Sequence, residues 1–355
     1  MPRAVDALVV GAGVSGLTTA VSLAEAGLRV RIWTAEPPSR TTSAAAGAMW
    51  GPYLVEPVDR VMEWSRRTLD EFEHLAQDPA TGVRMVTGIE ASRQRAEPPA
   101  WRHLLPEFRR CTREELPDGF VEGFRYTVPL VDMSVYLGYL ARRFESMGGE
   151  IETRAIASLI EAATEARLLV NCTGVRARFV VPDEDMRPIR GQLVVVANPG
   201  IEEFFSEETG PSPDLMHIYP HGSTAVLGGT AEEGSWELRP DPDIARAILA
   251  RCVEVEPRLE GAEILGHRVG LRPTRTRVRC EEERSPADGI RIVHNYGHGG
   301  AGVTLSWGCA AEVVRTIGLP SPAQTPRDQA QTRPRLPVIL ASPGSTTFPT
   351  GSRCR

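Results

Sequence analysis

Hydrophobic residues between positions 7 and 33 change their spacing twice. Ala7–Val10 is an uninterrupted apolar run of strand length, and Val30 and Ile32 alternate with arginines as in a second strand. Between these two runs, apolar side chains recur at the three- and four-residue spacing of a helix, at Leu17, Ala20, Val21, Leu23 and Ala24. The pattern therefore predicts a strand, a helix and a second strand in close succession.

The same two periodicities continue along the chain. The strands that they predict lie at 150–153, 168–171, 193–196, 217–220, 225–230, 266–279 and 290–293, and the helices at 60–74, 131–148, 240–257 and 305–317. Residues 51–130 are more mixed, and we interpret them as an insertion outside the first sheet. Residues 321–355 are rich in Pro, Thr, Ser, Gln and Arg without a hydrophobic period, which predicts a disordered tail.

The turn between the first strand and the first helix has the spacing G-x-G-x-x-G. Gly11 would make the tight turn, and Gly16 would let the helix pack close to the sheet. Gly13, after Ala12, would leave room for a pyrophosphate, which the helix N-terminus attracts with about half a positive charge. This context predicts a dinucleotide site; the alternative is a tight turn without a ligand.

Composition and charge narrow the class of protein. The 355 residues have a net charge of −6, which argues against a nucleic-acid surface. The six cysteines include no C-x-x-C pair, so we expect no metal site. No apolar run is long enough to span a bilayer, and the N-terminus has no signal-peptide pattern. We expect a soluble cytoplasmic protein with no membrane partner.

Two further segments follow the second strand. Glu36 is the acidic candidate for the ribose hydroxyls of a bound nucleotide, although it is equally consistent with an exposed loop acid. In residues 39–50, the hydroxyls of Thr41, Thr42 and Ser43 precede very small side chains. Hydroxyls bond phosphate, and small residues permit close approach, so we expect a second cofactor contact here rather than a flexible polar loop.

A second glycine-rich turn lies near the far end of the chain. Residues 294–304 read HNYGHGGAGVT and connect a predicted strand to a predicted helix. A single N-terminal fingerprint would serve NAD equally well. Two glycine turns that return to one sheet favour a long, two-ended cofactor such as FAD.

These residues resemble the D-amino-acid oxidase family of FAD-dependent enzymes, which includes D-aspartate oxidase. The matching segments are VVGAGVSGL, TTSAAAGAMWGPYL, VNCTGVRA, RGQL, LGGT, GHRVGLRPTR and HNYGHGGAGVTLSWGCA. They extend from residue 9 to about residue 310, nearly all of the chain except the tail.

The resemblance implies a role for particular residues. Arg272 would pair with the substrate carboxylate, the carbonyl of Gly300 would accept from the substrate amine, and Tyr53 would lie near the pocket entrance. A planar guanidinium suits a carboxylate because it binds both oxygens. The implied cofactor contacts are Gly11, Ala12, Gly13, Gly16, Glu36, Thr41, Thr42, Ser43, Gly47, Ala48, Met49, Ile156, Thr173, Gly299, Gly300, Gly302, Val303 and Thr304.

The chain departs from the family pattern at several positions. His217 stands where the family has a tyrosine that donates to the substrate carboxylate, and an imidazole could donate the same bond. The alternative is a half-buried strand histidine with a backbone partner. The family's lid tyrosine has no match near 211–215, and Tyr219 could contribute instead. Ala35 and Glu36 replace an Asp-Arg pair that the family has after the second strand. Together these departures are compatible with cofactor binding and leave the substrate preference open.

The fold that the resemblance implies is α/β, with a Rossmann-like FAD-binding domain and an interleaved α+β substrate domain built on a mixed or antiparallel sheet. We assign 1–50, 131–182 and 285–320 to the FAD-binding domain, and 51–130 and 183–284 to the substrate domain.

The implied reaction oxidises a D-amino acid with molecular oxygen to a 2-oxo acid, ammonia and hydrogen peroxide, by hydride transfer from Cα to flavin N5. The alternatives are an oxidase of D-aspartate, glycine or another amine, a non-catalytic FAD-binding protein, and an NAD dehydrogenase. Arg275 and Arg277 keep an acidic substrate open, and a homodimer is a further open expectation.

Overall fold

A single mixed β-sheet organises the chain. The computed structural model describes residues 5–52, 55–207, 214–284 and 289–320. Within these residues the strands follow the order β4-β5-β3-β9-β10-β11-β8-β13-β14-β7-β1-β2-β6, and β12 pairs with β8. All of these strands belong to one compact unit. The α/β class and the mixed sheet are therefore confirmed, whereas the division into two domains stays a prediction. The expected disordered tail lies outside the described residues.

One end of the sheet is parallel. Here β1 (Ala7–Val10) lies between β2 (Val30–Thr34) and β7 (Leu168–Asn171), with β6 (Glu150–Thr153) and β14 (Arg291–His298) beyond them. Helices α1 (Val14–Glu25), α3 (Met133–Ser146) and α6 (Gly302–Thr316) pack together beside these strands. The predicted strands at 7–10, 150–153 and 168–171 are confirmed with their boundaries. We call these five strands the parallel end.

The turn between β1 and α1 requires glycine for two different reasons. Gly11 has φ +112°, and a Cβ there would lie 2.3 Å from the carbonyl oxygen of Cys172 on the neighbouring strand end. A Cβ on Gly16 would lie 1.9 Å from the carbonyl oxygen of Gly11. The helix can therefore approach the sheet this closely only with a glycine at position 16, as the sequence predicted.

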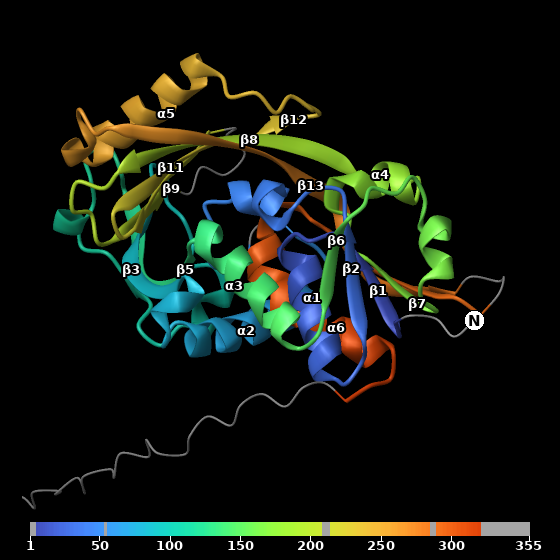
Figure 1. Cartoon of the computed structure of the whole chain (residues 1–355). Coiled ribbons are helices and arrows are strands. Elements are labelled where there is room, and N and C mark those ends of the chain that lie inside the picture. The colour runs from blue at the N-terminus through green and yellow to red at the C-terminus, as the bar shows by residue number, and fades with distance from the viewer. Residues whose placement is uncertain (1–4, 53–54, 208–213, 285–288, 321–355) are drawn as a thin grey trace, which may run out of the picture. The chain divides into compact units, whose positions relative to one another are not determined.

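The other end of the sheet is mostly antiparallel. Its long strands are β3 (Val83–Ser92), β5 (Glu122–Val131), β8 (Arg187–Ala197), β10 (Asp214–His221), β11 (Thr224–Thr230) and β13 (Ile264–Arg284), and its short strands are β4 (Arg109–Arg110), β9 (Phe204–Glu207) and β12 (Glu232–Glu233). We call this group the antiparallel end. Figure 1 shows it covered by α5 (Pro242–Val255) on one side, with α2 (Val58–Leu75) on the other, beside β3 and β5.

Two expectations need correction. Residues 51–130 are part of the same continuous sheet as the first strands, because β4, β5 and β3 form its far end and β3 pairs in parallel with β9. The last strand does not end at residue 293, because β14 continues to His298 and pairs antiparallel with β13. The sequence hid this continuation because Gly297 interrupts the apolar pattern that marks a strand. The glycine turn itself is therefore confined to Gly299–Ala301.

Candidate active site

A cavity of about 1170 Å³ extends from the β1–α1 turn at the parallel end to the strands of the antiparallel end. This volume exceeds the roughly 300–1,000 Å³ that is usual for a small-molecule site, so a dinucleotide and a small substrate fit together. The predicted residues that line it are Gly11, Ala12, Gly13, Glu36, Thr41, Thr42, Ser43, Gly47, Ala48, Met49, Ile156, Thr173, His217, Arg272, Gly299, Gly300, Gly302 and Val303.

The N-terminus of α1 faces the loop that carries the predicted hydroxyls. Ser43 Oγ accepts a hydrogen bond from the backbone N–H of Val14 at 3.0 Å, which leaves its own O–H able to donate into the cavity. Thr41 Oγ1 instead donates to the carbonyl of Pro38 at 2.8 Å. A Cβ on Gly13 would lie 3.0 Å from Ser43 Oγ, so this side of the turn stays narrow and polar. This is a suitable cradle for a pyrophosphate.

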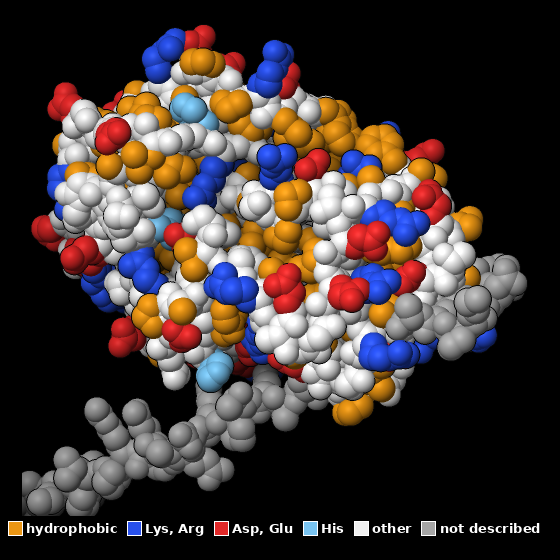
Figure 2. Space-filling view, viewed as in Figure 1, with side chains coloured by type: hydrophobic (Ala, Val, Ile, Leu, Met, Phe, Trp, Pro, Cys, Tyr) orange, Lys and Arg blue, Asp and Glu red, His pale blue; other side chains and the backbone are white. Residues whose placement is uncertain are grey.

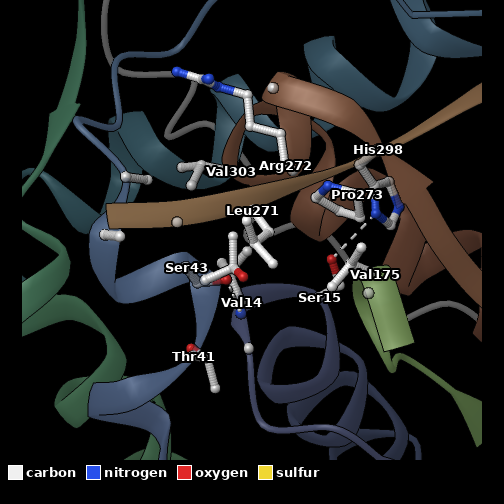
Figure 3. Close-up of a pocket in the computed structure, with 18 of the residues that line it drawn as sticks. Val14, Ser15, Thr41, Ser43, Val175, Leu271, Arg272, Pro273, His298 and Val303 are labelled. Carbon is white, nitrogen blue, oxygen red and sulfur yellow. Dashed lines mark hydrogen bonds between the residues drawn. The ribbon is translucent and has the colours of Figure 1, made fainter. Parts of the chain in front are cut away.

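A buried polar chain ties α1 to the end of β14. His298 Nε2 lies 3.0 Å from Asn295 Oδ1, and Asn295 Nδ2 donates to Thr19 Oγ1 at 3.0 Å. Nε2 therefore carries the proton, and Nδ1 accepts from Ser15 Oγ at 3.5 Å, the pair joined by the dashed line in Figure 3. Burial lowers the pKa of His298 to about 4, so the ring is neutral at pH 7. Sequence reasoning assigned no role to His298 or Asn295, although both belong to the HNYGHGG motif.

Arg272 lies on β13, on the opposite side of the strand from Leu271, which Figure 3 shows directed toward Ser43 and Val14. Its Nη1 donates to the carbonyl of Thr230 at 2.8 Å, across the intervening strand β8. The guanidinium lies directly over Gly191, where an added Cβ would be 2.5 Å from Nη1. The absence of a side chain on Gly191 therefore leaves the space that the guanidinium occupies. Gly191 belongs to the RGQL segment that matches the family.

His217 has a defined tautomer. Its Nδ1 lies 2.8 Å from the carbonyl oxygen of Leu215 and therefore donates, so Nε2 is an acceptor. The Nε2 atom is buried without a hydrogen-bond partner among the described residues. Burial lowers the pKa of the ring to about 4, which keeps it neutral at pH 7. The expected donor to a carboxylate is thus replaced by an acceptor, because the backbone of Leu215 takes the only ring proton.

The surroundings of His217 hold the ring in place. It stacks on Tyr219 with ring centroids 4.2 Å apart and an interplanar angle of 21°. A Cβ on Gly228 would lie 1.8 Å from its Cε1, and one on Gly47 would lie 3.0 Å from its Nε2. His217 therefore packs between its strand neighbour and the loop that carries the predicted cofactor residues.

Two predicted positions among the described residues, Gly16 and Thr304, do not line the cavity. Gly16 serves close packing instead. Thr304 Oγ1 accepts from the N–H of Gly51 and donates to its carbonyl, each at 3.1 Å, so it ties α6 to the loop, and its contact with a cofactor stays a prediction. Tyr53 lies outside the described residues. Arg275 and Arg277 do not line the cavity; Arg275 Nε instead pairs with Asp183 at 2.9 Å.

The described residues contain neither a metal-ligand cluster nor a membrane-spanning helix. In residues 5–52, 55–207, 214–284 and 289–320, His, Cys, Asp and Glu side chains nowhere gather in a group of three that could hold a metal ion. No helix in these ranges is both long and apolar enough to cross a membrane. On the face shown in Figure 2, arginine and acidic side chains are interspersed.

Known proteins match this chain over most of its length. A family model described as FAD dependent oxidoreductase matches residues 6–316. The D-amino-acid oxidase of Rubrobacter xylanophilus is 51% identical over 313 residues, covering 88% of this chain and 95% of the relative. That of Streptomyces coelicolor is 48% identical over 312 residues, covering 87% and 96%.

A solved structure supports the fold. Glycine oxidase from Geobacillus kaustophilus superposes with a TM-score of 0.74 at 19% identity, over 88% of this chain and 94% of that one. The expected class of cofactor is also confirmed by the family match, because the cradle at the β1–α1 turn and the long cavity suit FAD. The chain belongs to the family of FAD-dependent oxidoreductases that this model describes.

Proposed function

We propose that this protein oxidises D-amino acids to 2-oxo acids, with release of ammonia and hydrogen peroxide. The observation that carries the proposal is a fixed guanidinium, that of Arg272, in the same cavity as the β1–α1 turn. The two relatives named D-amino-acid oxidase, about half identical in sequence over nearly the whole chain, support the same substrate class.

The charged end of the substrate is held by Arg272. A guanidinium binds both oxygens of a carboxylate and so fixes the rotation of the substrate as well as its position. The bond from Nη1 to the Thr230 carbonyl and the contact with Gly191 restrict the side chain before substrate arrives. This preorganisation reduces the entropy lost on binding.

The amine is held by the carbonyl of Gly300, a residue that lines the cavity together with His217. A contact between the amine and the buried ring of His217 stays a prediction. With the carboxylate and the amine held at separate points, the hydrogen on Cα would face the flavin side of the cavity in only one of the two enantiomers, so that enantiomer is selected. No side-chain base is required, because orientation of a neutral amine is enough for the two-electron oxidation.

The residues at the parallel end fit FAD. Ser43 and the N-terminus of α1 would hold the pyrophosphate, Glu36 the ribose, and Gly299, Gly302 and Val303 the ring system. When bound, FAD supplies the two-electron acceptor and reacts with molecular oxygen. Apolar side chains in the cavity wall, including Met49, Leu193 and Trp101, keep water away from the reacting carbon.

The test is an anaerobic titration of the purified yellow holoenzyme with matched D- and L-amino acids, followed by flavin absorbance. We expect D-alanine and D-leucine to bleach the oxidised flavin and their L-enantiomers to leave it unchanged. Bleaching by the L-enantiomers alone, or by neither enantiomer of any amino acid in the panel, would refute the proposal.

A further inference from the structure

A row of polar side chains crosses the antiparallel end beside Arg272. In the sheet register, His217 on β10 pairs with Ser206 on β9, and Ser206 pairs with Glu90 on β3. Paired residues share a face of a sheet, so these three side chains project on the same side. All three line the cavity. Sequence reasoning missed Glu90 and Ser206, although alternation within 83–92 was the available signal.

The members of this row present hydrogen-bond acceptors. The Tyr126 hydroxyl donates to Glu90 Oε2 at 3.1 Å and thereby fixes the carboxyl group. Nε2 of His217 is an acceptor because Nδ1 uses the ring proton. Glu207, also in the cavity wall, is ion-paired with Arg93. Among the described residues, Glu90 is therefore the carboxylate in this wall that is left to face a substrate side chain.

The spacing sets the length of that side chain. Nη1 of Arg272 donates to a carbonyl on β11, and Glu90 lies on β3, three strands further along the sheet through β10 and β9. Neighbouring strands are about 4.8 Å apart, so at least about 14 Å separates the backbones of β11 and β3. Only a long unbranched substrate side chain extends far enough in that direction to approach Glu90; a short branched one does not.

The other arginines in the cavity wall lie at the parallel end. Among the described lining residues these are Arg40, Arg154 and Arg176, which follow β2, β6 and β7. Arg275 and Arg277, whose positive charges would suit an acidic substrate, do not belong to the cavity wall. A carboxylate on the substrate side chain would thus meet Glu90 rather than a second cation.

We propose that Glu90 selects D-amino acids that carry a cation at the end of a long unbranched side chain, such as D-lysine and D-arginine. The proposal rests on the oxidation of D-amino acids proposed above. Glu90 is then a specificity-determining residue, since it contacts the substrate far from the bond that is oxidised. A half-buried carboxylate in the cavity wall favours the cation over an apolar terminus of equal length.

The experiment compares kcat/KM of the holoenzyme for D-lysine and D-norleucine, which has the same carbon chain without the ammonium. We expect the wild type to prefer D-lysine, and Glu90→Gln to lower the ratio of the two values about ten- to a hundredfold. The amide keeps an oxygen for Tyr126. The matched control is Glu203→Gln, an exposed carboxylate just before β9 that pairs with Arg125 outside the cavity; it leaves the ratio unchanged.

A second measurement needs no variant. Acetylation of the side-chain amine of D-lysine removes its charge, and we expect kcat/KM of the wild type to fall at least tenfold. The proposal is overturned if D-norleucine is preferred, if Glu90→Gln leaves the ratio unchanged, or if the acetylated substrate is oxidised as well as D-lysine. If no D-amino acid reduces the flavin at all, the proposed function itself fails.

Discussion

The two ends of the sheet build their share of the cavity in different ways. At the parallel end, β1 is wholly apolar and buried, and Gly11 and Gly16 leave no space for a Cβ, so the backbone itself makes the turn. At the antiparallel end, side chains from separate strands line one cavity, as Glu90, His217 and Arg272 do. A cofactor common to many enzymes can be held by backbone geometry, whereas a particular substrate needs side chains that can vary.

Substitutions at the antiparallel end should therefore reduce activity while the protein keeps its cofactor. Arg272→Ala removes the carboxylate anchor. We expect the transition state to lose about 3–4 kcal/mol of stabilisation, so that kcat/KM for D-alanine falls several hundredfold. Flavin absorbance should remain that of the wild type. Arg277→Ala, at an exposed arginine of the same strand outside the cavity, is the control, and should change kcat/KM less than about twofold. Equal turnover of Arg272→Ala and the wild type would contradict the anchoring role.

Substitutions at the parallel end should instead lower the stability of the protein. Gly16→Ala places a Cβ 1.9 Å from the Gly11 carbonyl oxygen, which belongs to backbone and cannot swing away. We expect the free energy of unfolding to fall by about 3 kcal/mol and the flavin content of the purified protein to fall with it. Gly27→Ala, at φ +91° with open space around it, should cost only about 1 kcal/mol. Urea titrations measure both, and similar losses in the two variants would refute the close-packing argument.

The buried hydrogen-bond chain through His298, which connects α1 to β14, should make the free energy of unfolding depend on pH. His298 has a folded-state pKa of about 4 and an ordinary value of 6.5, so the unfolded chain binds more protons between these pH values. The stability that the neutral, buried ring of His298 provides is fully present above pH 6.5, and it is lost as the pH falls toward 4. Between pH 7 and 4.5 this amounts to about 2 kcal/mol. His298→Asn should flatten the plot of unfolding free energy against pH by that amount, and an unchanged slope would contradict the assignment.

The smallest effect sharpens the contrast between backbone and side-chain constraints. Gly191→Ala places a Cβ 2.5 Å from Nη1 of Arg272, but here the neighbour is a flexible side chain that can move. We expect KM for D-alanine to rise about tenfold, because the guanidinium is displaced. The unfolding free energy should change by less than about 0.5 kcal/mol. A loss of stability as large as that of Gly16→Ala would show that the two glycines act alike.

The same difference explains what the sequence could predict. Residues 7–33 contain the strand, the turn and the helix in one continuous stretch, so local spacing was enough to place Gly11, Gly13 and Gly16. The hydroxyls of Thr41 and Ser43 were also found, because they follow directly. Their separate bonding, Thr41 to Pro38 and Ser43 to Val14, depends on the folded loop and was not predictable.

The substrate wall could not be assembled from the sequence. Glu90 and Ser206 lie side by side only because β3 and β9 pair in parallel across a long crossover. The sequence pattern, by contrast, predicts that residues 51–130 lie outside the first sheet. The tautomer of His217 depends on a carbonyl two residues away whose direction local pattern does not give. Arg272 was identified through family resemblance, since its strand also carries Arg268, Arg275 and Arg277.

The most direct test of the account is a crystal structure of the holoenzyme with 2-aminoisobutyrate, a substrate analogue that has no hydrogen on Cα and is not oxidised. The account predicts the flavin ring between Gly47 and Gly300, with both carboxylate oxygens of the analogue on the guanidinium of Arg272 and its amine near Gly300. A carboxylate bound elsewhere, or a ring that does not reach the side of the cavity that holds Arg272, would contradict it.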